Sequence, residues 1–254
     1  MAREDRSTAW PKFKKERFDV IGRIERDHFW FHGRRQLVQF ALRERLDGKV
    51  QTIADIGCGT GFNLQAWERF GDRVLLLDRL SADARNAGHG RVASWTVCGD
   101  VRALPLAAGS IDLVIALDVL EHVPDAFTLE ECHRVLRSGA MLFLTVPALP
   151  WLWSFRDDDA GHLRRYTRRS LRGRVSRAGF AVEYVRFYQF LLLPLVVVSR
   201  LLGRKGRMPR DLEDKPHRAV NAVLRAVTGL EVKLIKLGIS FPIGSSLLMV
   251  ARKL

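Results

Sequence analysis

Three glycines at alternate positions are the feature of this chain best suited to binding a ligand. They are Gly57, Gly59 and Gly61, and the apolar run Thr52–Ile56 before them predicts a buried strand. A glycine has no Cβ, so this turn can bend sharply and bring backbone close to a bound molecule. A helix predicted to begin near Phe62 would direct unpaired N–H groups at a polar or anionic group there.

Acidic residues stand where the predicted strands end. Asp55 lies two residues before the first glycine, Asp78 ends the apolar run Val74–Leu77, and Asp100 follows Gly99. Ligands of open α/β sheets bind outside the carboxyl ends of their strands, where such carboxylates can accept hydrogen bonds from a ribose or an amine. The spacing differs from the dinucleotide pattern G-x-G-x-x-G.

A second group of chemically active side chains follows the later strands. His162 lies in a predicted loop that begins at Pro147, and we expect it to be the general base because imidazole titrates near neutral pH. His122, nearer the glycines, is the second candidate. Aromatic walls and polar groups that could position an acceptor are Trp151, Trp153, Arg165 and Tyr166.

Strands and helices alternate along the chain, which predicts right-handed crossovers and a mostly parallel sheet. The predicted strands are Thr52–Ile56, Val74–Asp78, Val92–Val97, Ile111–Leu117, Ala140–Val146, one that begins at Phe180, and Leu247–Val250. Predicted helices cover Phe62 to about Phe70 and Ala126–Leu136, and Thr167 or Ser170 caps a further helix that ends at Gly179. All the groups named above then meet at one edge of the sheet.

Four motifs together resemble the class I S-adenosylmethionine-dependent methyltransferases. They are D-I-G-C-G-T-G at 55–61, the strand-end Asp78, G-D-V at 99–101 and L-E-H-V at 120–123. The resemblance covers about residues 51–180 and the last strand. It is similar to methyltransferase domains of types 11 and 12 and to the O-methyltransferases of quinone biosynthesis. It implies a Rossmann-like α/β fold: a seven-stranded, mostly parallel sheet with helices on both faces and an antiparallel last strand.

The resemblance also implies a methyl donor, S-adenosyl-L-methionine, with S-adenosyl-L-homocysteine as product. Gly57, Gly59 and Gly61 would approach the amino-acid part of the donor, and Asp78 would bind its ribose. The other expected donor contacts are Asp55 near the amino group, Asp100 and the Val101 N–H at the adenine, the Leu117 carbonyl at the ammonium, and Arg34 at the carboxylate.

A metal site is a further possibility that the same family raises. Asp118, Glu121 and His122 resemble the acidic, acidic, histidine cluster of metal-assisted O-methyltransferases, but the first acid here is Asp where that cluster has Glu. Oxygen and imidazole ligands suit several divalent metals. Because of the Asp, we expect no metal.

The charge of the chain indicates a polyanionic neighbour. Its 254 residues include 42 Lys and Arg against 28 Asp and Glu, a net charge of +14. Nucleic acid is disfavoured, since the residues from Leu117 to Leu120 are unlike the motif of base-amino methyltransferases. Three scattered cysteines argue against a disulfide framework, and no apolar leader follows Met1, so we expect a cytoplasmic protein.

The predicted domains are an N-terminal helical cap at 1–48, a core at 49–186 and 244–254, and a helical insertion at 187–243 between the last two strands. The insertion opens with Phe187–Ser199, which contains no charged residue and is too short to span a bilayer. Five cations follow it: Arg200, Arg204, Lys205, Arg207 and Arg210. This pattern is typical of a segment that lies in an anionic membrane interface, so we expect peripheral attachment to the inner face of the membrane.

Three functions remain open from the sequence. The first is an O-methyltransferase for an amphipathic or lipid-linked acceptor. The second is a methyltransferase for a soluble small molecule, in which the insertion is a substrate lid or a dimer contact. The third is a protein of the same fold that binds nucleic acid or a partner without chemistry. The oligomeric state and the identity of the acceptor stay open.

Overall fold

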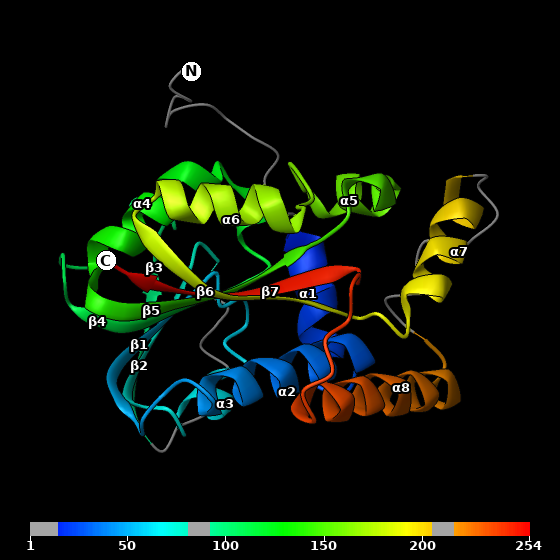
Figure 1. The fold of residues 1–254 in the computed structure, drawn as a ribbon, viewed down its shortest axis with the longest axis horizontal. Helices are drawn as coiled ribbons and strands as arrows, with labels where there is room; N and C mark the ends of the chain where they lie inside the picture. The colour runs from blue at the N-terminus through cyan, green and yellow to red at the C-terminus, as the bar shows by residue number, and fades with distance from the viewer. Residues whose placement is uncertain (1–14, 81–91, 205–215) are drawn as a thin grey trace.

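A sheet of seven strands forms the centre of the molecule (Figure 1). The computed structural model describes residues 15–80, 92–204 and 216–254, with the backbone alone at 15–17 and 202–204. The strands are β1 (Val50–Ile56), β2 (Gly71–Asp78), β3 (Ala93–Cys98), β4 (Ile111–Leu117), β5 (Leu136–Pro147), β6 (Phe180–Tyr188) and β7 (Ser246–Lys253). Their order is β3-β2-β1-β4-β5-β7-β6, with β7 antiparallel to β5 and β6 and the other pairs parallel. The predicted Rossmann-like sheet is confirmed.

Helices cover both faces of this sheet (Figure 1). The described helices are α1 (Lys15–Ile24), α2 (Phe29–Arg43), α3 (Leu64–Trp67), α4 (Asp125–Val135), α5 (Phe155–Ala160), α6 (Arg168–Arg177), α7 (Leu193–Arg204) and α8 (Arg218–Lys236), with 3-10 turns η2 (Leu120–His122) and η3 (Pro150–Leu152). Leu129 of α4 and Leu171 of α6 pack in the core of one face. Leu37 of α2, Trp67 of α3 and Ile235 of α8 pack in the core of the other.

The central strands are buried along most of their length, as their apolar sequences predict. Ile53–Ile56 of β1 and Leu113–Leu117 of β4 are buried without interruption. Because β1, β2, β4 and β5 run parallel, their carboxyl ends lie at the same edge. The polar residues that follow these strands are therefore brought together there.

The helices α2 and α8 lie side by side although almost the whole chain separates them (Figure 1). Asn221 accepts a hydrogen bond from the Phe29 N–H at 3.0 Å and donates one to the Asp27 carbonyl at 2.8 Å. A Cβ on Gly33 would lie 3.1 Å from the Cβ of Thr228, so glycine lets the helices approach closely. Helix α8 of the insertion thus packs against α2 and fixes it on the sheet.

Two local elements differ from the sequence prediction. The helix expected at 62–70 is reduced to Leu64–Trp67, because the chain must enter β2 at Gly71, where even a Cβ would lie 2.7 Å from Ile53. The segment expected to be a loop contains η3 and α5. Its prolines precede α5 and do not interrupt it, and a reciprocal cap between Ser154 and Asp157 starts that helix.

The first helix of the insertion begins with an apolar turn. Pro194 is the second residue of α7, a position in the first turn where the missing N–H costs no intrahelical hydrogen bond. Among the described helices, none combines the length and the apolar content that crossing a bilayer requires.

Candidate functional site

A cavity of about 700 Å³ lies at the carboxyl edge of the sheet. Its walls come from α1 and α2, the glycine turn, the ends of β1, β2 and β4, and the helices α5, α7 and α8. Most of the residues selected from the sequence line it: Arg34, Asp55, Gly57, Gly59, Asp78, Asp100, Val101, Leu117, His122, His162 and Arg165.

The glycine turn needs glycine for two reasons. Gly57, Gly59 and Gly61 all have positive φ, at 66°, 59° and 77°, which most side chains disfavour. A Cβ on Gly57 would also lie 2.5 Å from a methyl group of Val119, whereas Gly59 has open space beside it. Gly59 therefore presents bare backbone to the cavity, and Gly61 closes the turn through its N–H to the Cys58 carbonyl at 3.1 Å.

Asp78 ties the glycine turn to the end of β2. Its carboxylate accepts hydrogen bonds from the Gly59 N–H at 3.0 Å and the Leu80 N–H at 2.8 Å. Burial raises the pKa of this carboxyl, and these two hydrogen bonds oppose the shift. A carboxylate has room for further hydrogen bonds, so Asp78 can fix the turn and still accept from a ligand.

Asp55, near the end of β1, has a buried carboxyl. The Trp67 indole N–H donates to it at 2.7 Å, and burial raises its pKa to about 7. A carboxyl held in this state ionises readily when a cation binds nearby, because the opposite charge favours the charged form.

Asp100 lies in the cavity wall but is paired within the chain. The backbone N–H and the Nε of Arg102 donate to one of its oxygens at 3.0 and 2.9 Å. Burial raises the pKa of Asp100, but the Arg102 hydrogen bonds outweigh burial and the net shift is downward. Asp100 is thus a charged acceptor beside Val101, whose own place in the wall fits the expected adenine end.

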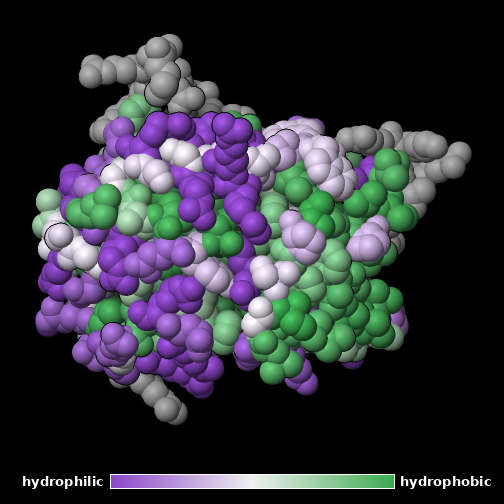
Figure 2. All heavy atoms as spheres, viewed as in Figure 1, coloured by the Kyte–Doolittle hydropathy of each residue, from purple (hydrophilic) through white to green (hydrophobic). Residues whose placement is uncertain are grey.

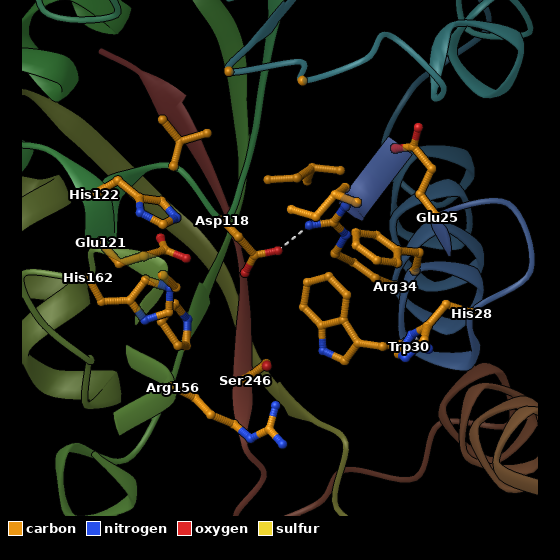
Figure 3. Close-up of a pocket in the computed structure, with 18 of the residues that line it drawn as sticks. Glu25, His28, Trp30, Arg34, Asp118, Glu121, His122, Arg156, His162 and Ser246 are labelled. Carbon is orange, nitrogen blue, oxygen red and sulfur yellow. Dashed lines mark hydrogen bonds and ion pairs between the residues drawn. The ribbon is translucent and has the colours of Figure 1, made fainter. Parts of the chain in front are cut away.

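Arg34 crosses the cavity from α2 to meet Asp118 at the end of β4 (Figure 3). Asp118 has a φ of 56° and also accepts from the Thr145 hydroxyl at 3.1 Å. The guanidinium lies over the Trp30 ring, 4.5 Å from its centroid. Within the described part of the chain, no group accepts a hydrogen bond from the buried Nε of Arg34, so this donor remains for a ligand.

Glu121, His122 and His162 gather on the opposite wall (Figure 3). Their ligand atoms all lie within 4.8 Å of one another, close enough to hold a metal ion. The sequence singled out Asp118 as a member of this group, but its carboxylate faces Arg34, and His162 is the third member instead. Burial raises the pKa of Glu121 well above its usual range, and the nearby Asp118 adds to the rise.

A buried carboxylate orients His162. Asp157 of α5 lies 2.8 Å from the His162 Nδ1 and also accepts from the Arg165 Nε at 2.7 Å. Burial alone would raise the pKa of Asp157, but its hydrogen bond to His162 and the charge of Arg165 lower it to about 2. The ionised carboxylate favours a proton on Nδ1 and leaves Nε2 as the free basic nitrogen.

Three residues expected at the acceptor do not line the cavity. The Tyr166 hydroxyl is buried within hydrogen-bond distance of the Leu120 carbonyl and Asp125, so it supports the fold of the loop. Trp151 lies exposed on the surface, and the Trp153 indole donates to Asp158 at 3.1 Å. Arg165 does line the cavity, but it is held by Asp157 and by the Ala148 carbonyl.

Several residues that line the cavity were not predicted from the sequence. Glu25, in the turn directly after α1, accepts from the Thr60 hydroxyl and so holds the end of α1 over the glycine turn. The cavity is also lined by Arg156, Gln189 and Ser246. The capping spacing from Ser154 to Asp157 could have indicated α5, but nothing local marks Glu25 or Gln189.

The comparisons with known proteins agree with this geometry. Residues 54–144 match a family described as a methyltransferase domain. A Mycolicibacterium smegmatis protein assigned as an S-adenosylmethionine-dependent methyltransferase is 30% identical over 65% of this chain and 64% of its own length. A ubiquinone biosynthesis O-methyltransferase of Xanthomonas oryzae is 36% identical over 40% of this chain and 45% of its own length. The chain thus spans about half to two thirds of these relatives.

A solved structure shows the same fold over nearly the whole chain. It is a complex of the Haloferax volcanii Trm112 methyltransferase activator with a methyltransferase. The likeness has a TM-score of 0.60 at 19% identity and covers 92% of this chain and 96% of that one. The matched domain and the named relatives identify a methyltransferase domain of the S-adenosylmethionine-dependent class within this chain, and the solved structure shows the class I fold.

Proposed function

We propose that the protein transfers a methyl group from S-adenosyl-L-methionine to an oxygen of an amphipathic or lipid-linked acceptor. The observation that carries this proposal is the single cavity that joins two unlike halves. One half consists of backbone, acidic groups and Arg34. The other is lined by apolar side chains of the N-terminal helix and of the insertion.

The first half suits the donor. Gly57 and Gly59 let backbone approach its amino-acid part, Asp78 accepts from the ribose hydroxyls, and Asp55 faces the cationic amino group. Burial raises the pKa of Asp55 to about 7, so at neutral pH about half of these carboxyl groups stay protonated until a cation binds nearby. The unpartnered Nε of Arg34 is a donor for the carboxylate of the same ligand. Asp100, Val101 and Leu117 complete the contacts at the adenine and the ammonium.

The second half suits an acceptor with an apolar body. Its wall is formed by Phe29, Trp30, Leu192, Leu195, Val196, Val220 and Leu224. Such pockets bind mainly by excluding water from apolar surface, while a few polar groups fix orientation. A long hydrocarbon part can lie between α7 and α8 while its polar end reaches the donor.

Transfer to an oxygen requires that the nucleophile, the sulfur and the methyl carbon lie in line and that the oxygen lose its proton. His162 is the proposed base, with Nδ1 held by the ionised Asp157 and Nε2 free to take the proton. His122 lies against His162, with ring centroids 4.7 Å apart, and restricts how the imidazole can turn. The Xanthomonas relative, named as an O-methyltransferase, supports oxygen as the acceptor atom.

An anionic membrane surface is the proposed source of the acceptor. Hydrophobic side chains gather over α7 and α8 (Figure 2). Those half or more exposed are Leu195, Val198, Leu201, Val220, Val223 and Leu230. Arg218, Lys233 and Lys236 of α8 are also exposed, and Leu195 and Val220 line the cavity. The same face is thus continuous with the acceptor half.

Charge favours lipid over a second copy of the chain on this face. Two copies would each carry a net charge of +14 and repel each other, whereas anionic headgroups attract a chain of this charge. Lys205, Arg207 and Arg210, part of the cationic run noted in the sequence, lie outside the described residues, and Arg204 is described in its backbone alone. The proposal therefore stands on the faces of α7 and α8.

Donor binding is the first test. Asp78→Ala should weaken binding of S-adenosyl-L-homocysteine by about 10-fold to 100-fold in calorimetry, because hydrogen bonds to a charged group are lost. Asp78→Asn keeps one acceptor oxygen and should lose less. Asp72→Ala, at an exposed acid of the same strand, should bind like the wild type. Equal affinity in all three variants would remove Asp78 from the donor site.

The second test concerns the base. His162→Ala should lower turnover by about 10²-fold to 10⁴-fold on any hydroxyl or carboxyl amphiphile that the wild type methylates, with donor affinity unchanged. His133→Ala, at a histidine packed on Phe180 outside the cavity, is the control. Normal turnover in His162→Ala would contradict the assignment. Loss of wild-type turnover in EDTA, restored by a divalent metal, would make His162 a metal ligand instead.

The third test concerns the membrane face. The protein should bind vesicles that contain anionic phospholipid at low salt and bind neutral vesicles much less. The pair Val223→Gln and Leu230→Gln should weaken binding about tenfold or more, since two apolar side chains no longer leave water. Trp95→Gln, at an exposed aromatic on β3, should change nothing. If the wild-type protein does not bind anionic vesicles, the insertion is better explained as a lid that covers a soluble acceptor.

A further inference from the structure

Gln189 is held in a backbone conformation that its residue type disfavours. It directly follows β6 and has a φ of 61°, in the left-handed region that suits glycine. Non-glycine residues persist there only when their surroundings fix them, and such positions cluster at ligand sites. Specific contacts must therefore hold the backbone of Gln189 in this conformation, and the conformation is expected to serve a function.

Glu231 of α8 holds Gln189 in this backbone conformation. Its carboxylate accepts hydrogen bonds from the Gln189 N–H and, at 2.9 Å, from the Leu191 N–H. Only 3% of Glu231 is exposed, and burial raises its pKa although these N–H groups oppose the rise. A buried carboxyl from the insertion thus clamps the link between β6 and α7. Without it, the buried N–H of Gln189 and the partly buried N–H of Leu191 would need other acceptors.

The environment of the Gln189 side chain indicates what this conformation is for. Gln189 lines the cavity yet is only 4% exposed, and its buried amide nitrogen has no hydrogen-bond partner among the residues that the structure describes. A buried donor left unsatisfied is costly, and in native structures it usually has a functional reason. An occupant that supplies an oxygen atom would remove this cost.

The strand order places Gln189 away from the reacting centre. Its strand β6 lies three strands beyond β4 along the sheet, past β5 and β7. Neighbouring strands are about 4.8 Å apart, so three steps across the sheet separate the backbone of Gln189 from that of β4 by roughly 14 Å. A group bound at Gln189 therefore belongs to a remote part of the acceptor.

We propose that Gln189 is a second recognition point, which donates a hydrogen bond to an oxygen within the body of the acceptor, and that Glu231 positions it. This inference rests on the proposed function and narrows its acceptor class. The acceptor is an amphiphile with two oxygen groups: one that takes the methyl group and one, roughly 14 Å away, that accepts from an amide. An acceptor that lacks the second oxygen would leave the Gln189 donor unpaired and bind less well.

Two fatty acids that differ in one carbonyl test the proposal. Calorimetry on the full chain with S-adenosyl-L-homocysteine present gives the affinities for dodecanoate and for its 11-oxo analogue, whose ketone can only accept. Wild type should prefer the ketone, and Gln189→Leu and Gln189→Glu should each lower that preference about tenfold or more. Glu231→Gln should lower it too, with donor affinity unchanged.

The matched control is Gln39→Leu, on α2 and outside the cavity lining, which should keep the wild-type preference. The same preference in wild type and Gln189→Leu would overturn the inference, as would binding of neither fatty acid. Because S-adenosyl-L-homocysteine binding is measured in the same samples, failure at Gln189 is distinguished from failure of the donor site. A protein that binds no donor would overturn both.

Discussion

The structure depends on how negative charge is accommodated at the buried ends of two central strands. Asp55 is the last residue but one of β1, and Asp118 and Glu121 follow β4. Isolated buried carboxylates are costly, so each must be protonated, hydrogen-bonded or paired with a cation. Arg34 provides the cation for Asp118, which requires α2 to lie across the edge of the sheet, and α8 holds α2 there. The N-terminal helix and the insertion are thus parts of the site.

The same constraint explains why the cavity has two characters. Near β1 and β4 it contains acids that lack a full set of partners, which suits a ligand with positive charge. Toward β7 and β6 it is bounded by α7 and α8, whose exposed faces are apolar. His162 lies between these regions on a loop fixed by Asp157. The proposed donor, base and acceptor would therefore meet in this one cavity.

The sequence predicted the parts of this arrangement that local patterns encode. The strands follow from apolar runs, the turn from its glycines and the acidic strand ends from their place after those runs. Tyr166 was misplaced because the direction of a loop side chain depends on distant packing, here against Asp125. The Arg34–Asp118 pair and the Gln189–Glu231 clamp join residues far apart in the chain, so no local pattern could reveal them.

Proton release on donor binding tests the central claim, that the buried acids are arranged for a cationic ligand. At pH 7 a carboxyl with a pKa of about 7 is half protonated, so a bound ammonium should displace roughly half a proton from Asp55. Calorimetry with S-adenosyl-L-methionine in buffers of different ionisation enthalpy measures this number directly. Wild type should release about half a proton more than Asp55→Asn. The same proton balance in both proteins would contradict it.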